Sequence, residues 1–196
     1  MKSLPVVVLP NMDRTSTSAY ELLHRQDTYF KYYQEAAGGS EKALVFFTGN
    51  YDELDKNQWG SITPIKLGPS FIPWLIFPFI LVRYLKKDEI KPSFVVAGTP
   101  FQPYAIALIT RLLLPKLKIQ LSVHGEISGV RGKGISGWLK FNFFKATISQ
   151  ANLIRFVTNL QAEQFRPYIA NSQKIVVTPV PISLPLEERR ERIPRT

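Results

Sequence analysis

Short apolar runs alternate along this chain with longer segments of helical periodicity. Seven runs predict strands, at residues 4–10, 42–49, 61–68, 93–100, 119–123, 152–158 and 174–182. Several of them are apolar without interruption, which is typical of strands buried on both faces. The segments between them predict helices, from Ser18 to the Gly-Gly pair at 38–39 and at 104–114, 135–150 and 159–170. This alternation predicts a Rossmann-like α/β fold, a mostly parallel sheet of about seven strands with helices on both faces.

The stretch 69–87, PSFIPWLIFPFILVRYLKK, has two interpretations. Its unbroken apolar run from Phe71 to Val82 contains two prolines and is too short to span a bilayer. Trp74 and Phe79 stand close to Arg83 and to a Lys pair, a mixture that can lie on an anionic membrane surface. The same residues also suit a crossover segment that covers the sheet and buries its apolar side chains in the core.

Composition limits the possibilities further. A chain of 196 residues is long enough for one sizeable α/β domain. It contains no cysteine, which excludes disulfides and thiolate metal sites and is compatible with the cytosol. The N-terminal apolar run is too short for a signal peptide. We therefore expect a cytoplasmic chain, with the inner face of the membrane as the place for any peripheral attachment.

The positive charge is confined to one half of the chain. Residues 1–90 carry equal numbers of basic and acidic side chains, whereas residues 91–182 carry 11 basic and 2 acidic ones. Such an asymmetry indicates an anionic partner, which can be nucleic acid, anionic lipid or a phosphorylated small molecule. A basic surface that only keeps the protein soluble is the alternative.

The candidate binding residues follow the predicted strands. In parallel α/β sheets, ligands bind outside the carboxyl ends of the strands. Small or polar residues occupy those positions here: Asn11 and Arg14 after the first strand, Thr99 after the fourth, and Asn159 after the sixth. We therefore expect these four residues at one edge of the sheet.

The fifth strand ends at His124, which Gly125 and Glu126 follow. An imidazole can donate and accept hydrogen bonds near neutral pH, so His124 and Glu126 could orient a hydroxyl group or contact a phosphate. In an extended segment these two side chains point the same way, and Gly125 leaves room for a ligand. The alternative is a histidine at a strand end that serves no chemistry.

A glycine-punctuated loop, GVRGKGISG at 129–137, carries Arg131 and Lys133 and leads into a predicted helix. Backbone amides and a helix start can hold an anion, but the order of residues matches neither a P-loop nor the G-x-G-x-x-G fingerprint. An ordinary surface loop is the alternative. Metal catalysis has no support, because the two histidines are 100 positions apart and no carboxylate cluster joins them.

The order of these features resembles a known family. The stretches SFVVAGTPFQPYAIALITRLLLPKLKIQLSVHGE, KATISQANLIRFVTNLQAEQF and NSQKIVVTPVPIS are similar to the N-terminal, acceptor-side domain of a family 4 GT-B-type glycosyltransferase. The likeness covers about half of the chain, and its weight lies in the ordered set rather than in one motif. One departure is the first-strand loop, NMDRTSTSA, which lacks the Gly-Gly turn that the family often has there.

The resemblance implies a division of the chain and a reaction. It makes 1–182 the GT-B N-terminal Rossmann-like domain and 183–196 the stub of an interdomain linker, with the C-terminal donor-binding domain absent. A hexosyltransferase of this type transfers a sugar from a nucleotide-sugar to a glycan or lipid-linked acceptor, without a metal or a cofactor. His124 and Glu126 then become catalytic residues, the remaining candidates become substrate-binding residues, and the chain alone is expected to be inactive.

Two rival functions stay open. One is a non-catalytic Rossmann-like binding module whose basic half docks an anionic partner. The other is a nucleic-acid-binding α/β protein, which is disfavoured because the aromatic residues gather in apolar runs instead of alternating with Lys and Arg.

Overall fold

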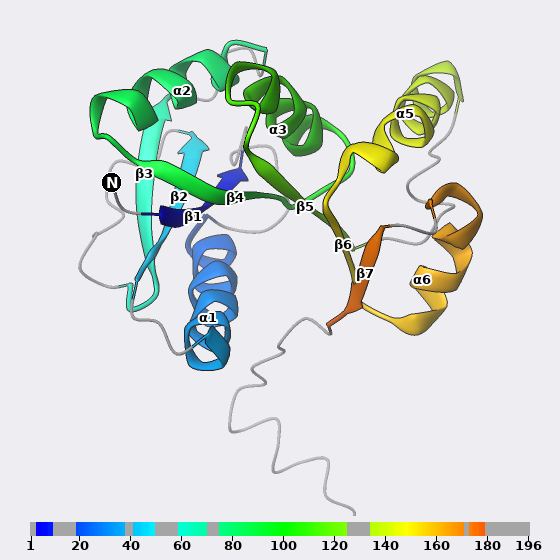
Figure 1. Cartoon of the computed structure of the whole chain (residues 1–196), viewed down its shortest axis with the longest axis horizontal. Helices are drawn as coiled ribbons and strands as arrows, with labels where there is room; N and C mark the ends of the chain where they lie inside the picture. Colours follow the sequence, from blue (N-terminus) through cyan, green and yellow to red (C-terminus); the bar gives the residue numbers. More distant parts are fainter. Residues whose placement is uncertain are drawn as a thin grey trace, which may run out of the picture.

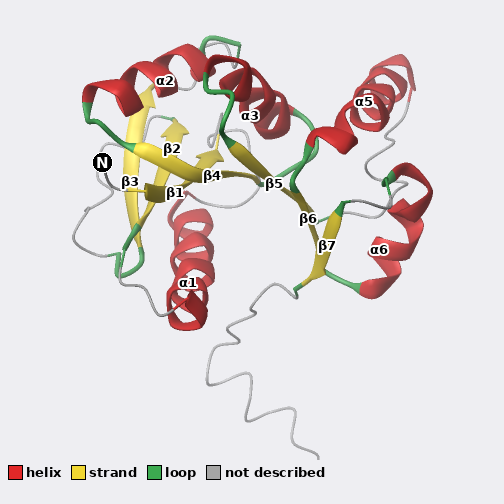
Figure 2. Ribbon diagram, in the orientation of Figure 1, coloured by secondary structure: helices red, strands yellow, loops and turns green. Residues whose placement is uncertain are grey.

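The computed structural model describes residues 3–9, 19–37, 41–49, 59–69, 75–124, 134–170 and 173–178. Figures 1 and 2 show strands and helices alternating along the chain. The strands are β1 (Ser3–Leu9), β2 (Ala43–Thr48), β3 (Ile62–Gly68), β4 (Lys91–Ala97), β5 (Lys118–Val123), β6 (Leu153–Phe156) and β7 (Lys174–Val177). The helices are α1 (Ala19–Ala37), α2 (Phe77–Lys87), α3 (Gln102–Leu113), α5 (Gly134–Thr147) and α6 (Asn159–Phe165), with short 3₁₀ turns η3 (Ile148–Gln150) and η4 (Arg166–Tyr168).

The strands form one sheet in the order β3-β2-β1-β4-β5-β6-β7, and each neighbouring pair is parallel. The predicted Rossmann-like α/β fold is therefore confirmed. The chain moves outward from β1 to β3, then returns and moves outward on the other side from β4 to β7. This reversal puts the topological switch point between β1 and β4, the place where such sheets bind ligands.

Both faces of the sheet bury apolar side chains, as the uninterrupted runs predict. Leu23 and Phe30 of α1 pack on one face against Val7, Val45 and neighbouring residues. The helices α2, α3, α5 and α6 supply the core on the opposite face (Figure 2). Alternate residues of β1, β2 and β4 thus enter two different cores, so the middle of each of these strands is apolar on both faces.

Polar contacts fix two of these helices in place. Asp27 of α1 accepts hydrogen bonds through its Oδ1 atom from the backbone amides of Ser61 (2.6 Å) and Ile62 (3.2 Å), at the start of β3. On the other face, the Tyr104 hydroxyl of α3 donates to the Thr147 carbonyl at the end of α5, at 2.5 Å. The first contact orients α1 along the sheet, and the second fixes the last turn of α5 beside α3.

The stretch 69–87 contributes a helix to the core. Pro78 stands in the first turn of α2, where its missing amide costs no hydrogen bond. Phe77, Leu81 and Leu85 are fully buried against the sheet, whereas Phe79 is exposed. The crossover interpretation therefore describes most of α2, and Trp74 lies outside the described residues. Among the described helices, none combines the length and the apolar character needed to cross a membrane.

Substitutions on the two sides of α5 should differ in their effect on stability. Phe144 is fully buried and packs edge-on against Phe165 at 5.5 Å between ring centroids, whereas Leu139 on the same helix is exposed. We expect Phe144→Ala to lower the free energy of unfolding by about 3–5 kcal/mol because it leaves a cavity. Leu139→Ala should cost less than about 1 kcal/mol. Urea titration followed by circular dichroism measures both; equal losses would contradict the packing.

Candidate active site at the carboxyl edge of the sheet

Three of the predicted site residues follow three adjacent strands. Thr99 lies in the bend after β4, His124 follows β5 directly, and Asn159 is the first residue of α6, after β6. All three are exposed. Because adjacent strands lie about 4.8 Å apart and run parallel, their carboxyl ends form one continuous edge. The sheet therefore brings Thr99, His124 and Asn159 to the same edge, next to the switch point between β1 and β4.

The other predicted site residues lie outside the described residues. They are Asn11, Arg14, Gly125, Glu126, Arg131 and Lys133. Their placement stays a prediction, as does the pairing of Glu126 with His124.

Gln161 connects the ends of β5 and β6. Its side-chain amide donates to the His124 carbonyl at 3.3 Å, and its side-chain oxygen accepts from the Val157 amide at 3.0 Å. Thr158 is the N-cap residue of α6, and its hydroxyl accepts a hydrogen bond from the Gln161 backbone amide at 3.2 Å. One glutamine thus holds the backbone of His124 at a fixed position relative to the start of α6.

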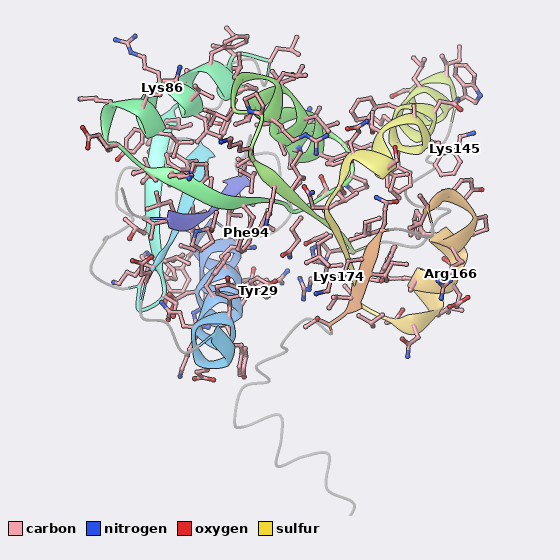
Figure 3. The ribbon with its side chains drawn as sticks, in the orientation of Figure 1. Tyr29, Lys86, Phe94, Lys145, Arg166 and Lys174 are labelled. Atoms are coloured by element: carbon pink, nitrogen blue, oxygen red, sulfur yellow. The ribbon has the colours of Figure 1, made fainter. Side chains whose placement is uncertain are left out.

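A polar layer lies beneath this edge, on the face of the sheet that α1 covers. Gln120 of β5 donates through its side-chain amide to the Tyr29 hydroxyl of α1 at 3.1 Å. The Arg155 guanidinium of β6 lies 4.7 Å from the centroid of the Tyr29 ring, and its Nη2 atom donates to the Thr178 carbonyl at 3.1 Å. Figure 3 shows Tyr29 on the side of α1 that faces these strands. One tyrosine therefore contacts both β5 and β6.

Arg155 is only 7% exposed, and burial lowers its pKa while Tyr29 acts in the opposite direction. A guanidinium stays protonated in proteins even when its pKa falls. The Arg155 guanidinium is therefore a permanent positive charge close to the carboxyl edge, on the face of the sheet that α1 covers. Anionic groups of a ligand at this edge would be attracted to it.

The pKa of His124 lies below the ordinary histidine value. Loss of hydration is the largest cause, followed by the positive charges of Arg155 and then Arg25. The His124 side chain is exposed, so water screens part of these effects. The consequence is a neutral imidazole at pH 7, with one nitrogen that donates and one that accepts.

Sequence reasoning missed four of the residues that shape this edge. They are Arg25, Tyr29, Arg155 and Gln161. Arg155 did leave a signal, because a single arginine inside the apolar run LIRFV is unusual in a buried strand. Tyr29 and Gln161 left none, since neither differs in pattern from its neighbours on the same helix.

Within the described part of the chain, no group of three or more His, Asp and Glu side chains could hold a metal ion. The carboxyl edge therefore offers hydrogen-bonding groups and positive charge. The expectation of a metal-independent site stays a prediction.

The fold is that of an α/β protein with a Rossmann-like parallel sheet, a class that binds ligands at the carboxyl ends of the strands. No protein-family model matches the chain, and no curated protein sequence matches it significantly. Among solved structures, the chain is similar to a sucrose-phosphate synthase from Thermosynechococcus elongatus. The TM-score is 0.56 at 10% sequence identity, over 91% of this chain and 90% of the other. This likeness shows a shared fold.

The positive environment of His124 leads to a pH prediction. We expect the imidazole to titrate below the ordinary value of about 6.5, and Arg25→Gln to move its pKa upward by removing one nearby cation. Proton NMR of the His24→Gln background, which leaves one imidazole, measures this directly. A pKa at or above the ordinary value, or no response to Arg25→Gln, would contradict the electrostatic account.

The same shift has a defined effect on stability. A histidine with a lowered pKa in the folded state binds fewer protons there than in the unfolded chain. Its contribution to stability is therefore fully present above about pH 6.5 and decreases as the pH falls toward the folded-state pKa. Replacing His124 by Gln should flatten this part of the stability profile.

Proposed function

We propose that this chain is the acceptor-binding part of a glycosyltransferase. In the proposed reaction a hexose passes from a nucleotide-sugar to a glycan or to a lipid-linked acceptor. The observation that carries the proposal is the alignment of Thr99, His124 and Asn159 on three adjacent strand ends beside the switch point. The likeness of the fold to a sucrose-phosphate synthase supports it, because the product in that name is a phosphorylated disaccharide.

The chemistry of the edge suits a sugar. Sugar hydroxyl groups both donate and accept hydrogen bonds, and exposed Thr, Asn and neutral His side chains can match them in either sense. The lowered pKa of His124 keeps the imidazole neutral at pH 7 and so preserves its accepting nitrogen. Arg155 and Arg25 add a positive potential that favours any phosphate on the donor or the acceptor.

In this proposal His124 holds a sugar hydroxyl in the orientation that the reaction needs. The Gln161 hydrogen bond to the His124 carbonyl fixes the backbone that carries the imidazole. Fixed hydrogen bonds that strengthen as charge develops in the transition state are worth a factor of about 10²–10³ in rate. We further propose that Glu126 acts beside His124 and that Asn11, Arg14, Gly125, Arg131 and Lys133 contact the substrates.

The proposed division of labour follows the GT-B pattern that the sequence resembles. Residues 1–182 supply the acceptor side, 183–196 connect to a second Rossmann-like domain, and that domain holds the nucleotide-sugar. No step of the proposal needs a metal or a further cofactor. The competing function, a binding module without catalysis, is favoured by the 11 basic residues in 91–182 and requires only that the same edge bind an anion.

Ligand binding tests the assignment of the edge. We expect the chain to bind hexoses or hexose phosphates, and His124→Ala to weaken that binding by about tenfold through loss of one or two hydrogen bonds. Isothermal calorimetry measures the affinity, and the melting temperature should stay unchanged. Lys118→Ala is the matched control, because Lys118 is exposed at the opposite end of the same strand.

Three outcomes would contradict the proposal. The first is equal weakening by Lys118→Ala, the second is full affinity in His124→Ala, and the third is unfolding of that variant. Binding of inorganic phosphate with the same affinity as a hexose phosphate would favour the anion-binding module instead.

Turnover distinguishes the half-enzyme from a complete one. Without a donor-binding domain, residues 1–196 should not transfer sugar from a nucleotide-sugar to any acceptor that they bind. A coupled assay for nucleotide release, with the bound hexose present, measures this. Efficient release by this chain alone would refute the proposed division into two domains.

A further inference from the structure

Helix α5 exposes apolar side chains along the face that points away from the core. Ile135 is 79% exposed, Trp138 62% and Leu139 56%, and Phe143 is exposed as well. These four residues form what we call the α5 outer face. Figure 1 shows α5 at the periphery of the molecule. A helix of a soluble protein normally turns charged and polar side chains outward, so this face is unusual.

The buried side of the same helix is already occupied. Phe141 and Phe144 enter the core together with Gly137. At about 100° of rotation per residue, Leu139 lies roughly 160° around the helix from Phe141. The α5 outer face is therefore opposite the core contact, and packing within the described chain does not cover it.

Two lysines flank the α5 outer face, one on each side. Lys140 and Lys145 lie roughly 100–120° around the helix from Leu139, in opposite directions. Their ammonium groups lie near aromatic rings, Lys140 at 5.8 Å from the Phe101 centroid and Lys145 at 5.3 Å from the Phe141 centroid. Each charge is thus held at the border between the apolar face and the body of the protein, and both side chains are exposed.

The sequence around α5 contains no acidic residue. Between Glu126 and Glu163 the sequence contains no Asp or Glu, while Arg131 and Lys133 precede the helix. An apolar face bordered by cations on both sides and lacking carboxylates matches the interface of an anionic bilayer. There the apolar side chains enter the acyl boundary, and the lysines meet the phosphates.

We infer that the α5 outer face binds an anionic lipid surface. A second copy of the chain fits less well, because packing α5 on α5 would bring four lysines together without a carboxylate on either helix. A protein partner would need a groove for a protruding helix, whereas a bilayer receives a convex apolar helix directly. Trp138 also suits the bilayer interface, where its ring is amphipathic.

This surface differs from the one that the sequence indicated at 69–87. Most of the apolar residues of α2 are buried in the core, and among the described residues of this stretch the exposed large apolar side chains are Leu75, Ile76 and Phe79. In contrast, α5 directs four large apolar side chains outward from 14 residues. The inference is independent of the proposed sugar chemistry, since none of the carboxyl-edge residues takes part.

Vesicle co-sedimentation of the full chain tests the inference. We expect binding to phosphatidylcholine vesicles that contain phosphatidylglycerol, little binding to phosphatidylcholine alone, and release by salt. Leu139→Ser should weaken binding by about tenfold through the loss of apolar insertion. Lys140→Gln and Lys145→Gln should each weaken it by about fivefold and together reduce the preference for anionic lipid.

Leu112→Ser is the matched control. Leu112 is 81% exposed on α3, so it tests whether any exposed apolar side chain has the same effect. Its binding should equal that of the unchanged protein, and all four variants should keep their melting temperature because the positions are exposed. Equal binding to neutral and anionic vesicles, or equal effects of Leu112→Ser and Leu139→Ser, would overturn the inference. A dimer in solution that Leu139→Ser converts to a monomer would assign the face to a second copy instead.

Discussion

The parallel alignment of the strands is the constraint on which the other features of this structure depend. Parallel neighbours cannot be joined by a tight turn, so each connection crosses a face of the sheet, usually as a helix. Those helices cover both faces, which favours apolar residues on both sides of β1, β2 and β4. The same alignment puts the carboxyl ends of β4, β5 and β6 at one edge, together with Thr99, His124 and Asn159. The parallel arrangement of the strands therefore produces both the buried core and the edge that carries the candidate site.

The polar layer beneath the edge joins the part of the sheet that α1 covers to the outer strands. Tyr29 contacts Gln120 of β5 and Arg155 of β6, while its own helix packs over β1 and β2. A buried guanidinium is tolerated there because the tyrosine ring and the Thr178 carbonyl replace part of its lost hydration. Loss of hydration is the main cause of the lowered pKa of His124, and the positive charge of Arg155 lowers that pKa further. The packing of Tyr29 against Arg155 thus contributes to the electrostatics of the candidate site.

Much of the fold could be predicted from the sequence because parallel strands and crossover helices leave strong periodic signals. The runs around Val7, Val45 and Val95 are apolar at every position, and each is a strand. The position of His124 could be predicted for the same reason, since a strand end is visible as the end of an apolar run. One polar contact beneath the edge could not be predicted. The hydrogen bond from Gln120 to Tyr29 joins residues 91 positions apart, and no local pattern encodes such a pair.

Helix α5 shows a second limit of sequence reasoning. Its apolar residues are spread around the helix. The sequence therefore predicts a helix here but does not indicate which side of it faces the core. Only packing decides that Phe144 is buried and Leu139 exposed. The stretch 69–87 shows the opposite case. Its composition is compatible with a membrane surface, yet most of the apolar side chains of α2 pack against the sheet.

We propose that ligands bind at the carboxyl edge of β4, β5 and β6. The most direct measurement is a backbone amide NMR titration of the chain with a hexose phosphate. The account predicts that the largest shifts cluster at Thr99, His124 and Gln161, while Lys91, Lys118 and Lys174, at the amino ends of the strands, do not move. Shifts that gather at the amino ends, or on α5 and not at the edge, would contradict it.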